Sequence, residues 1–171
     1  MNQLERLSAI EDIKRCKARY ARGADSQDWE LFASAFAADA VWDLRGFAIA
    51  RSVRTGEWNS EGSIFDLPFL ENFSNLITWP KIGRDAIKTG SRDIMVSVSA
   101  SFHRLFNPEI DITTQTEAAV IWPFEETIQF SGAGPVNYMN GLGYYHETYT
   151  CEEGRWLIKT CRLLRTIFNI G

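Results

Sequence analysis

Residues 116–130 have the pattern of a long β-strand, and this segment limits the possible folds more than any other feature. Successive side chains of a strand point to opposite faces, so residues of one parity share a face. One face is apolar except for a single carboxylate, and it carries Ala118, Val120, Trp122, Phe124, Glu126 and Ile128. Pro123 lies in the middle, where it can kink the strand or shift its register. The segment therefore predicts a strand with one buried face.

The rest of the C-terminal half also favours β-structure. We expect four further strands, over residues 102–106, 109–113, 141–151 and 155–168. The first two lie on either side of an Asn107-Pro108 turn, and residues 152–154 join the last two in a hairpin. Residues 131–135 are expected to form a loop. Together these segments predict a meander of long strands.

The N-terminal half is helical by its pattern. Apolar residues recur at three- and four-residue steps, at Leu4, Leu7, Ile10, Ile13, Cys16 and Tyr20. Asn2 and Glu5 have the spacing of a capping box, and Gly23 is a natural stop. We therefore expect a first helix from about residue 3 to Gly23.

Shorter elements connect this helix to the strands. A turn at residues 25–29 leads into a second helix through about Phe36, and a first strand covers residues 40–44. Another helix begins at residues 83–87. Helices first and a strand meander later predict an α+β fold, with helices packed against one face of an antiparallel sheet.

The length of 171 residues suits one domain, which we expect to span residues 1–171. Residues 45–82 are the least regular part, and six aromatic rings fall there, at Phe47, Trp58, Phe65, Phe69, Phe73 and Trp79. Asp66 could cap a helical turn within this stretch. So many rings in a long loop indicate either a lid over a ring-binding pocket or a subunit interface.

Composition and charge argue against several classes of protein. The net charge is −4 and no Lys/Arg run occurs, which disfavours nucleic acid and anionic membranes as partners. No apolar stretch reaches the ~18 residues that a spanning helix needs, and the polar N-terminus is unlike a signal peptide. The three cysteines, two histidines and absent CxxC motif indicate reduced thiols in a cytoplasmic protein and no metal site.

Glu126 is the first candidate functional residue. A carboxylate on an apolar face loses hydration, so it needs a cation or a hydrogen-bond donor nearby. Arg165, on the last strand, is the candidate partner. The alternative is a glutamate on an edge strand that faces solvent.

Three further polar residues are candidates, each with a structural alternative. His103 precedes a turn and could be catalytic or structural, and His146 is the weaker of the two histidines. Asp25 could be a helix N-cap, and Tyr20 could be a core ring. The sequence contains no nucleophile elbow, phosphate loop or dinucleotide fingerprint.

Three stretches, in this order and spacing, resemble the SnoaL-like branch of the nuclear-transport-factor-2-like superfamily. They are residues 19–25 with 28–29 and 36–40, residues 101–103 with 107–110, and residues 143–145 with 154–158. The resemblance covers nearly the whole chain apart from residues 45–82. It implies a cone-like α+β barrel, in which a curved antiparallel sheet wraps around the N-terminal helices and leaves an open hydrophobic pocket. It also implies a homo-oligomer, with a trimer favoured, and no cofactor.

Within this group the enzyme pattern is similar to that of bile acid 7α-dehydratase and scytalone dehydratase. The positions that match it are Tyr20, Asp25, His103, Glu126 and Arg165. Glu126 departs from the pattern, which has Asp there, and the extra methylene would move the carboxyl group. The resemblance implies that His103, Asp25 and Tyr20 are catalytic. Glu126 and Arg165 would then bind substrate, and we expect Trp42 and Tyr144 to do so as well.

The function expected from this resemblance is a cofactor-independent, dehydratase-like lyase with a His103–Asp25 general base. The substrate would be a bulky hydrophobic aromatic, polyketide or steroid-like molecule, for which the ring-rich composition is suited. Three alternatives remain open: an isomerase of a similar ring substrate, a non-catalytic ligand-binding protein, and a small subunit of an oxygenase complex.

Overall fold

The computed structural model describes residues 1–45, 79–132 and 137–171. Its elements are α1 (Gln3–Asp25), α2 (Trp29–Ala33), β1 (Phe36–Asp43), β2 (Lys81–Ile82), α3 (Arg84–Ile94), the short 3-10 helix η2 (Met95–Ser97), β3 (Val98–Leu105), β4 (Glu109–Ile112), β5 (Glu117–Phe130), β6 (Tyr138–Glu152) and β7 (Arg155–Ile170). Predictions for residues 46–78, including the turn at Asp66, and for residues 133–136 lie outside the described residues. No helix within the described residues is long and apolar enough to cross a membrane.

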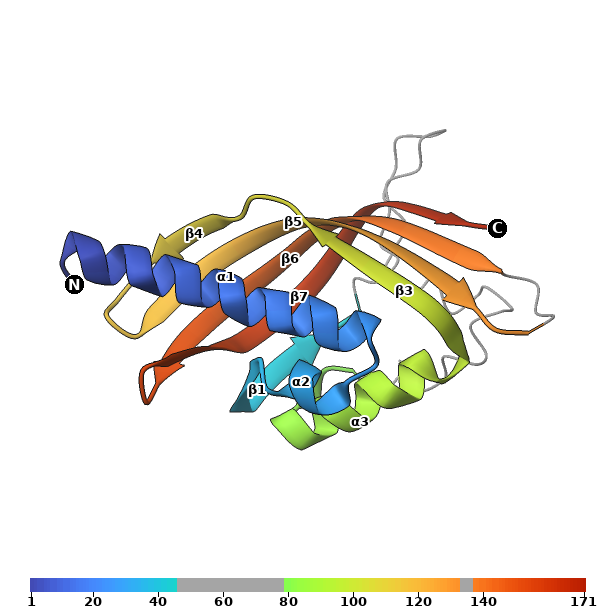
Figure 1. Ribbon diagram of the computed structural model, residues 1–171, viewed down its shortest axis with the longest axis horizontal. Coiled ribbons are helices and arrows are strands. Elements are labelled where there is room, and N and C mark those ends of the chain that lie inside the picture. Colours follow the sequence, from blue (N-terminus) through green and yellow to red (C-terminus); the bar gives the residue numbers. More distant parts are fainter. Residues whose placement is uncertain (46–78, 133–136) are drawn as a thin grey trace.

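Within the part of the chain that the structure describes, the strands form one curved sheet of seven strands that does not close (Figure 1). Their order is β2-β1-β7-β6-β5-β3, and β4 also pairs with β5. The predicted α+β class is therefore confirmed. One pairing differs from the expected antiparallel sheet, because β1 runs parallel to β7. The sheet is mixed, since a strand near the N-terminus is brought beside the last strand of the chain.

The helices lie on one side of this sheet. Helix α1 crosses the sheet, and α2 and α3 pack together near the C-terminal end of α1 (Figure 1). The capping box is confirmed: Asn2 Oδ1 accepts a hydrogen bond of 2.9 Å from the backbone N–H of Glu5, and Glu5 accepts one from Asn2. Leu4 and Leu7, expected on the buried face, are exposed. The first turns of α1 therefore lie outside the core.

Two predicted helix boundaries are wrong. Gly23 lies inside α1, which continues to Asp25, and α2 ends at Ala33 so that Phe36 already begins β1. A Cβ atom at Gly23 would lie 2.4 Å from the backbone nitrogen of Phe32. The glycine therefore allows α1 and α2 to approach each other closely, rather than ending the helix.

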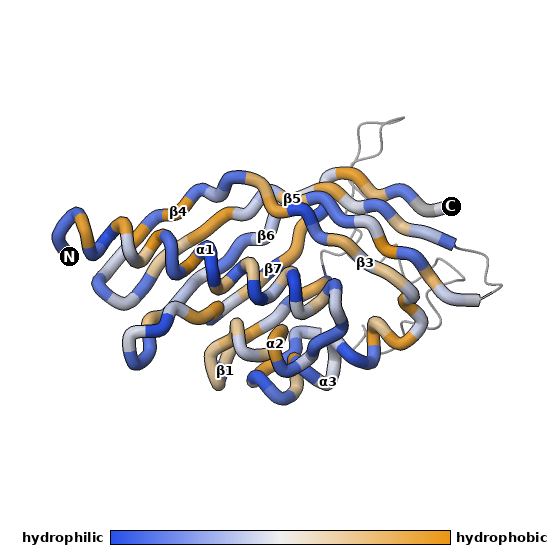
Figure 2. The backbone as a smooth tube through the Cα atoms, viewed as in Figure 1, coloured by the Kyte–Doolittle hydropathy of each residue, from blue (hydrophilic) through white to orange (hydrophobic). Residues whose placement is uncertain are grey.

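The alternation along β5 is confirmed. All six residues predicted to face inward are buried, and buried residues alternate with more exposed ones along β5. Figure 2 shows that the long strands carry both hydrophobic and hydrophilic residues. Pro123 causes no register shift against β6. It lies between the stretch of β5 that pairs with β4 and the stretch that pairs with β3, so its missing N–H breaks neither ladder.

A bulge in β7 decides which side chains of that strand face inward. Leu142 pairs with Ile167 and Gly143 pairs with Arg165, so Thr166 is an extra residue. Arg165 is buried on the inner side, whereas Ile167 is exposed. A Cβ atom at Gly143 would lie 2.1 Å from the carbonyl oxygen of Leu164. Glycine at this position therefore permits the bulge.

Replacement of Gly143 by alanine should lower the free energy of unfolding by about 2–3 kcal/mol, because the clash is with backbone that cannot rotate away. Urea unfolding followed by circular dichroism measures the loss. Gly132→Ala is the matched control. No atom lies within 4 Å of its added methyl group, so only its positive φ of 112° should cost about 1 kcal/mol. Equal losses in the two variants would contradict a packing role for Gly143.

Candidate active site

Asp25, the last residue of α1, binds His103 of β3 through two hydrogen bonds. Its Oδ1 lies 2.6 Å from Nδ1 of His103, and its Oδ2 accepts the backbone N–H of His103 at 2.9 Å. The Ser101 hydroxyl donates to Oδ1 at 3.2 Å. Asp25 is thus not a helix N-cap. Because a carboxylate accepts hydrogen bonds, this contact assigns a ring proton to Nδ1, and in a neutral ring Nε2 then carries the lone pair.

Glu126 lies on the other side of the His103 ring. His103 and Glu126 are paired across β3 and β5, and Nε2 lies 3.3 Å from Oε2 of Glu126. Glu126 is 2% exposed, and β5 lies inside the sheet between β3 and β6. The alternative of an edge-strand glutamate in solvent is therefore wrong. The imidazole lies between two carboxylates.

Arg165 provides the cation that a buried Glu126 requires. Its Nη2 donates to Oε1 of Glu126, and its side chain is 1% exposed. Burial lowers the pKa of Arg165 to about 9, which leaves the guanidinium charged at neutral pH. The contact expected from the sequence is present. Asp25, His103, Glu126 and Arg165 form a continuous row from α1 across β3 and β5 to β7.

This row borders a pocket with mostly apolar walls. The cavity has a volume of about 60 Å³, and the empty space that includes its open mouth is about 510 Å³. The lining residues outside the row are Tyr20, Ala24, Trp29, Phe32, Trp42, Leu44, Ser91, Ile94, Met95, Ile128, Tyr145 and Leu163. Three members of the row, His103, Glu126 and Arg165, line the pocket as well. Their charges therefore border an otherwise apolar space.

Tyr20 and Trp42 line the pocket, and both were candidate site residues in the sequence. Each carries a hydrogen-bond donor on its aromatic ring. Tyr20 is 3% exposed, and burial raises the pKa of its hydroxyl well above the usual value near 10. The hydroxyl therefore stays protonated at neutral pH. Within the described residues, the buried indole N–H of Trp42 makes no hydrogen bond. Both side chains can thus offer a proton donor to a ligand.

Tyr144 does not belong to this pocket. The sequence predicts it as a substrate-binding residue, but its side chain is 42% exposed on the outer face of β6. The neighbouring Tyr145 is buried and lines the pocket instead. The parity of the strand explains the error, because successive residues point to opposite faces. His146, the weaker histidine candidate, shares the outer face with Tyr144 and is exposed.

Sequence reasoning missed Tyr145 and Ser101, and a usable signal existed for both. Ser101 has the parity of His103 on β3, so both point to the same side. Tyr145 likewise has the parity of Glu147 and Tyr149 on β6.

Only Trp79 of the six rings counted in residues 45–82 is described, and its ring packs edge-on against Trp42 with centres 4.7 Å apart. Among the described residues, no group of three or more His, Cys, Asp or Glu side chains is arranged to hold a metal ion.

Comparison with known proteins identifies the family. A family model described as a SnoaL-like domain matches residues 5–162, and the chain belongs to this family. The family lies in the nuclear-transport-factor-2-like superfamily, as the sequence predicts. No protein among those with curated functions matches the chain.

Solved structures show the same fold at low sequence identity. A protein from Novosphingobium aromaticivorans DSM 12444, provisionally assigned as a scytalone dehydratase, has a TM-score of 0.72 and 19% identity over 99% of this chain and 92% of its own. A hexachlorocyclohexane dehydrochlorinase, LinA-type3 from Novosphingobium barchaimii LL02, has a TM-score of 0.73 and 13% identity over 99% of this chain and 94% of its own. At such identities the likeness establishes the fold, whereas the activity must be argued from the site.

Replacement of Asp25 by asparagine should remove the preference for a proton on Nδ1 of His103. The amide offers one oxygen where the carboxylate serves three donors, so the free energy of unfolding should also fall by about 1–3 kcal/mol. Nitrogen NMR of labelled histidine reads the tautomer, with exposed His146 as the reference. Asp28→Asn, which changes the N-cap of α2, should leave the His103 signals unchanged. A wild-type ring with its proton on Nε2 would contradict the assignment.

Proposed function

We propose that this protein is a lyase that performs a dehydratase-like elimination on a bulky hydrophobic ring substrate. The observation that carries the proposal is the row Asp25–His103–Glu126–Arg165 at the wall of an apolar pocket. A positioned imidazole backed by a carboxylate is suited to general base catalysis. The family and the dehydratase-like and dehydrochlorinase neighbours are consistent with this reaction class.

In the proposed reaction, Nε2 of His103 takes a proton from a substrate carbon. The electron pair of the broken C–H bond forms a C=C bond, and the leaving group departs with the electrons of its own bond. A departing hydroxide takes up the proton from His103 and leaves as water, which returns the imidazole to its neutral form. The imidazolium that forms lies between Asp25 at Nδ1 and Glu126 at Nε2, which stabilise its charge. Arg165 balances Glu126, so the site gains no unpaired anion. All these steps are assigned to side chains, and the proposal includes no cofactor.

Hydrogen-bond donors assist the departure of the leaving group. The protonated Tyr20 hydroxyl is assigned to a carbonyl or leaving oxygen of the substrate, and the Trp42 N–H is available for a second oxygen. An oriented donor at developing negative charge typically contributes about 10²–10³-fold to the rate. The donors and the base lie on walls of one pocket, so a single bound molecule could reach both.

The chemistry of the pocket wall supports the substrate class. Aromatic and aliphatic residues dominate it, which favours a phenolic, polyketide or steroid-like ring system over a small polar metabolite. Glu126 in place of the Asp of the dehydratase pattern reaches both His103 and Arg165. We therefore assign it to support of the base, rather than to binding a substrate hydroxyl.

His103→Ala should lower turnover by about 10²–10⁴-fold and leave the fold intact. A panel of polycyclic and phenolic β-hydroxy ketones is incubated with the protein, and the masses of the products are measured by mass spectrometry. Loss of water marks a lyase, whereas unchanged mass with altered structure marks an isomerase. His146→Ala is the matched control, since His146 is exposed on the outer face, and it should keep wild-type turnover. Normal turnover by His103→Ala would exclude His103 as the base.

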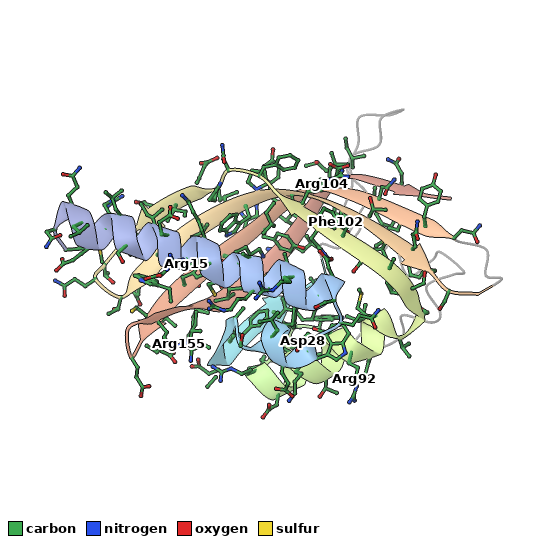
Figure 3. All side chains as sticks on the ribbon, viewed as in Figure 1. Arg15, Asp28, Arg92, Phe102, Arg104 and Arg155 are labelled. Atoms are coloured by element: carbon green, nitrogen blue, oxygen red, sulfur yellow. The ribbon has the colours of Figure 1, made fainter. Side chains whose placement is uncertain are left out.

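We further propose that the protein is a cytoplasmic homo-oligomer, with a trimer favoured. The outer face of the sheet exposes large apolar side chains, namely Phe102, Phe106, Tyr144 and Ile167. Phe102 and Arg104 are labelled on β3 in Figure 3. Large apolar side chains exposed on one face of a sheet are typical of a protein interface. The free thiols of Cys16, Cys151 and Cys161 suit a reducing compartment.

Sedimentation equilibrium should give the mass of three chains for the wild-type protein. Phe102→Glu should shift the mass toward one chain, because a charge would be buried against apolar neighbours. Val96→Glu is the control, since Val96 is 82% exposed and lies in η2, outside the strands of the sheet. A wild-type protein with the mass of one chain would contradict the proposed assembly and leave the site unaffected.

A further inference from the structure

Lys17 and Glu147 form an ion pair inside the core, apart from the row at His103. Nζ of Lys17 lies 2.6 Å from Oε1 of Glu147, and both side chains have no exposed area. The Tyr149 hydroxyl donates a hydrogen bond of 2.7 Å to the other carboxylate oxygen. A buried ion pair is often no more stabilising than apolar side chains of similar size, because both charges lose their hydration. Stability alone is therefore a weak reason for a lysine here.

Lys17 also contacts two tyrosine rings of the pocket wall. Its Nζ lies 3.8 Å from the centre of the Tyr20 ring and 3.6 Å from the centre of the Tyr145 ring. Tyr20 follows Lys17 by three residues on α1, so the two share a side of the helix. Both tyrosines line the pocket, whereas Lys17 and Glu147 do not. The two rings therefore separate a buried cation from the space that a ligand would occupy.

A cation on the face of an aromatic ring is attracted to the ring electrons, and the attraction is stronger where water is excluded. The charge draws electron density from the phenol oxygen, which makes the O–H a stronger hydrogen-bond donor. We propose that Lys17 is a positioning residue that acts through Tyr20: its ammonium, held on the ring by Glu147, strengthens the hydrogen bond that Tyr20 donates to a substrate oxygen. This inference rests on the proposed function, in which Tyr20 is that donor.

Burial of the hydroxyl acts in the opposite direction. Desolvation raises the pKa of Tyr20 and of Tyr145 well above the usual value near 10, which keeps both hydroxyls protonated but makes them weaker acids. The titratable and charged groups around Tyr20 are Lys17 on α1, Tyr145 and Glu147 on β6, Cys161 and Arg165 on β7, and His103 and Glu126 across the pocket. Lys17 is the cation in contact with the ring face, so it is placed to offset part of this loss.

The test measures the acidity of Tyr20 directly. All five tyrosines are replaced biosynthetically by a fluorinated tyrosine, which ionises at lower pH, and each ring is followed by fluorine NMR through a pH titration. Variants with Tyr changed to Phe assign the signals. Lys17→Met should lower the acid constant of Tyr20 about tenfold, and Lys17→Arg should keep it near the wild-type value. The exposed Tyr138 and Tyr144 should not respond.

An unchanged Tyr20 titration in folded Lys17→Met protein would overturn the proposal. Tyr149→Phe is the matched control, because it removes a hydrogen bond to Glu147 and leaves Lys17 on the ring. Its Tyr20 titration should equal that of the wild type, and a tenfold change would show that the effect does not come from the cation.

Two further experiments distinguish a failure of this inference from a failure of the variant to fold and from a failure of the proposed function. If Lys17→Met does not fold, the triple variant Lys17→Met/Glu147→Met/Tyr149→Phe removes the three polar groups without leaving an unpaired buried charge. Its Tyr20 acid constant should also fall, and an unchanged value would again overturn the proposal. Wild-type turnover by Tyr20→Phe would refute the donor role in the proposed function, while the titrations would still decide whether Lys17 acts on Tyr20.

Discussion

The row of polar side chains from Asp25 through His103 and Glu126 to Arg165 is the constraint on which the site depends. Each member is largely buried, so each needs the next one to compensate for lost hydration. The row joins the end of α1 to β3, β5 and β7. Displacement of one member would leave its neighbour without a partner. The interactions between these side chains therefore also hold α1 at a defined place against the sheet.

The backbone of the sheet makes room for this row. A Cβ atom at Gly141 of β6 would lie 2.4 Å from Nε of Arg165 and 2.8 Å from Oε1 of Glu126. Arg165 has the parity of the buried Leu163 and points inward next to that space, and the bulge at Thr166 turns the following Ile167 outward. A glycine and an irregularity in pairing, each unfavourable for an isolated strand, are thus located where the buried ion pair requires volume.

Some of this arrangement could be predicted from the sequence, because it depends on local periodicity. The alternation along 116–130 predicted a buried Glu126, and desolvation predicted its cation, Arg165. Other features depend on long-range packing and left no local signal. The parallel pairing of β1 with β7 joins the two ends of the chain, and Phe36 suits a helix as well as a strand. Tyr144 was an avoidable error, since parity already separates it from Tyr145.

Lys17 illustrates a different limit of sequence reading. A lysine on a helix is normally solvated, and only the fold shows that this one is enclosed by two rings and a carboxylate. The interior therefore holds two sets of interacting polar groups. One borders the pocket, and the other lies behind the rings of Tyr20 and Tyr145. Since both are fixed before any ligand arrives, their fields act on the pocket without reorganisation. This is the condition under which buried dipoles and charges are most effective in stabilising developing charge.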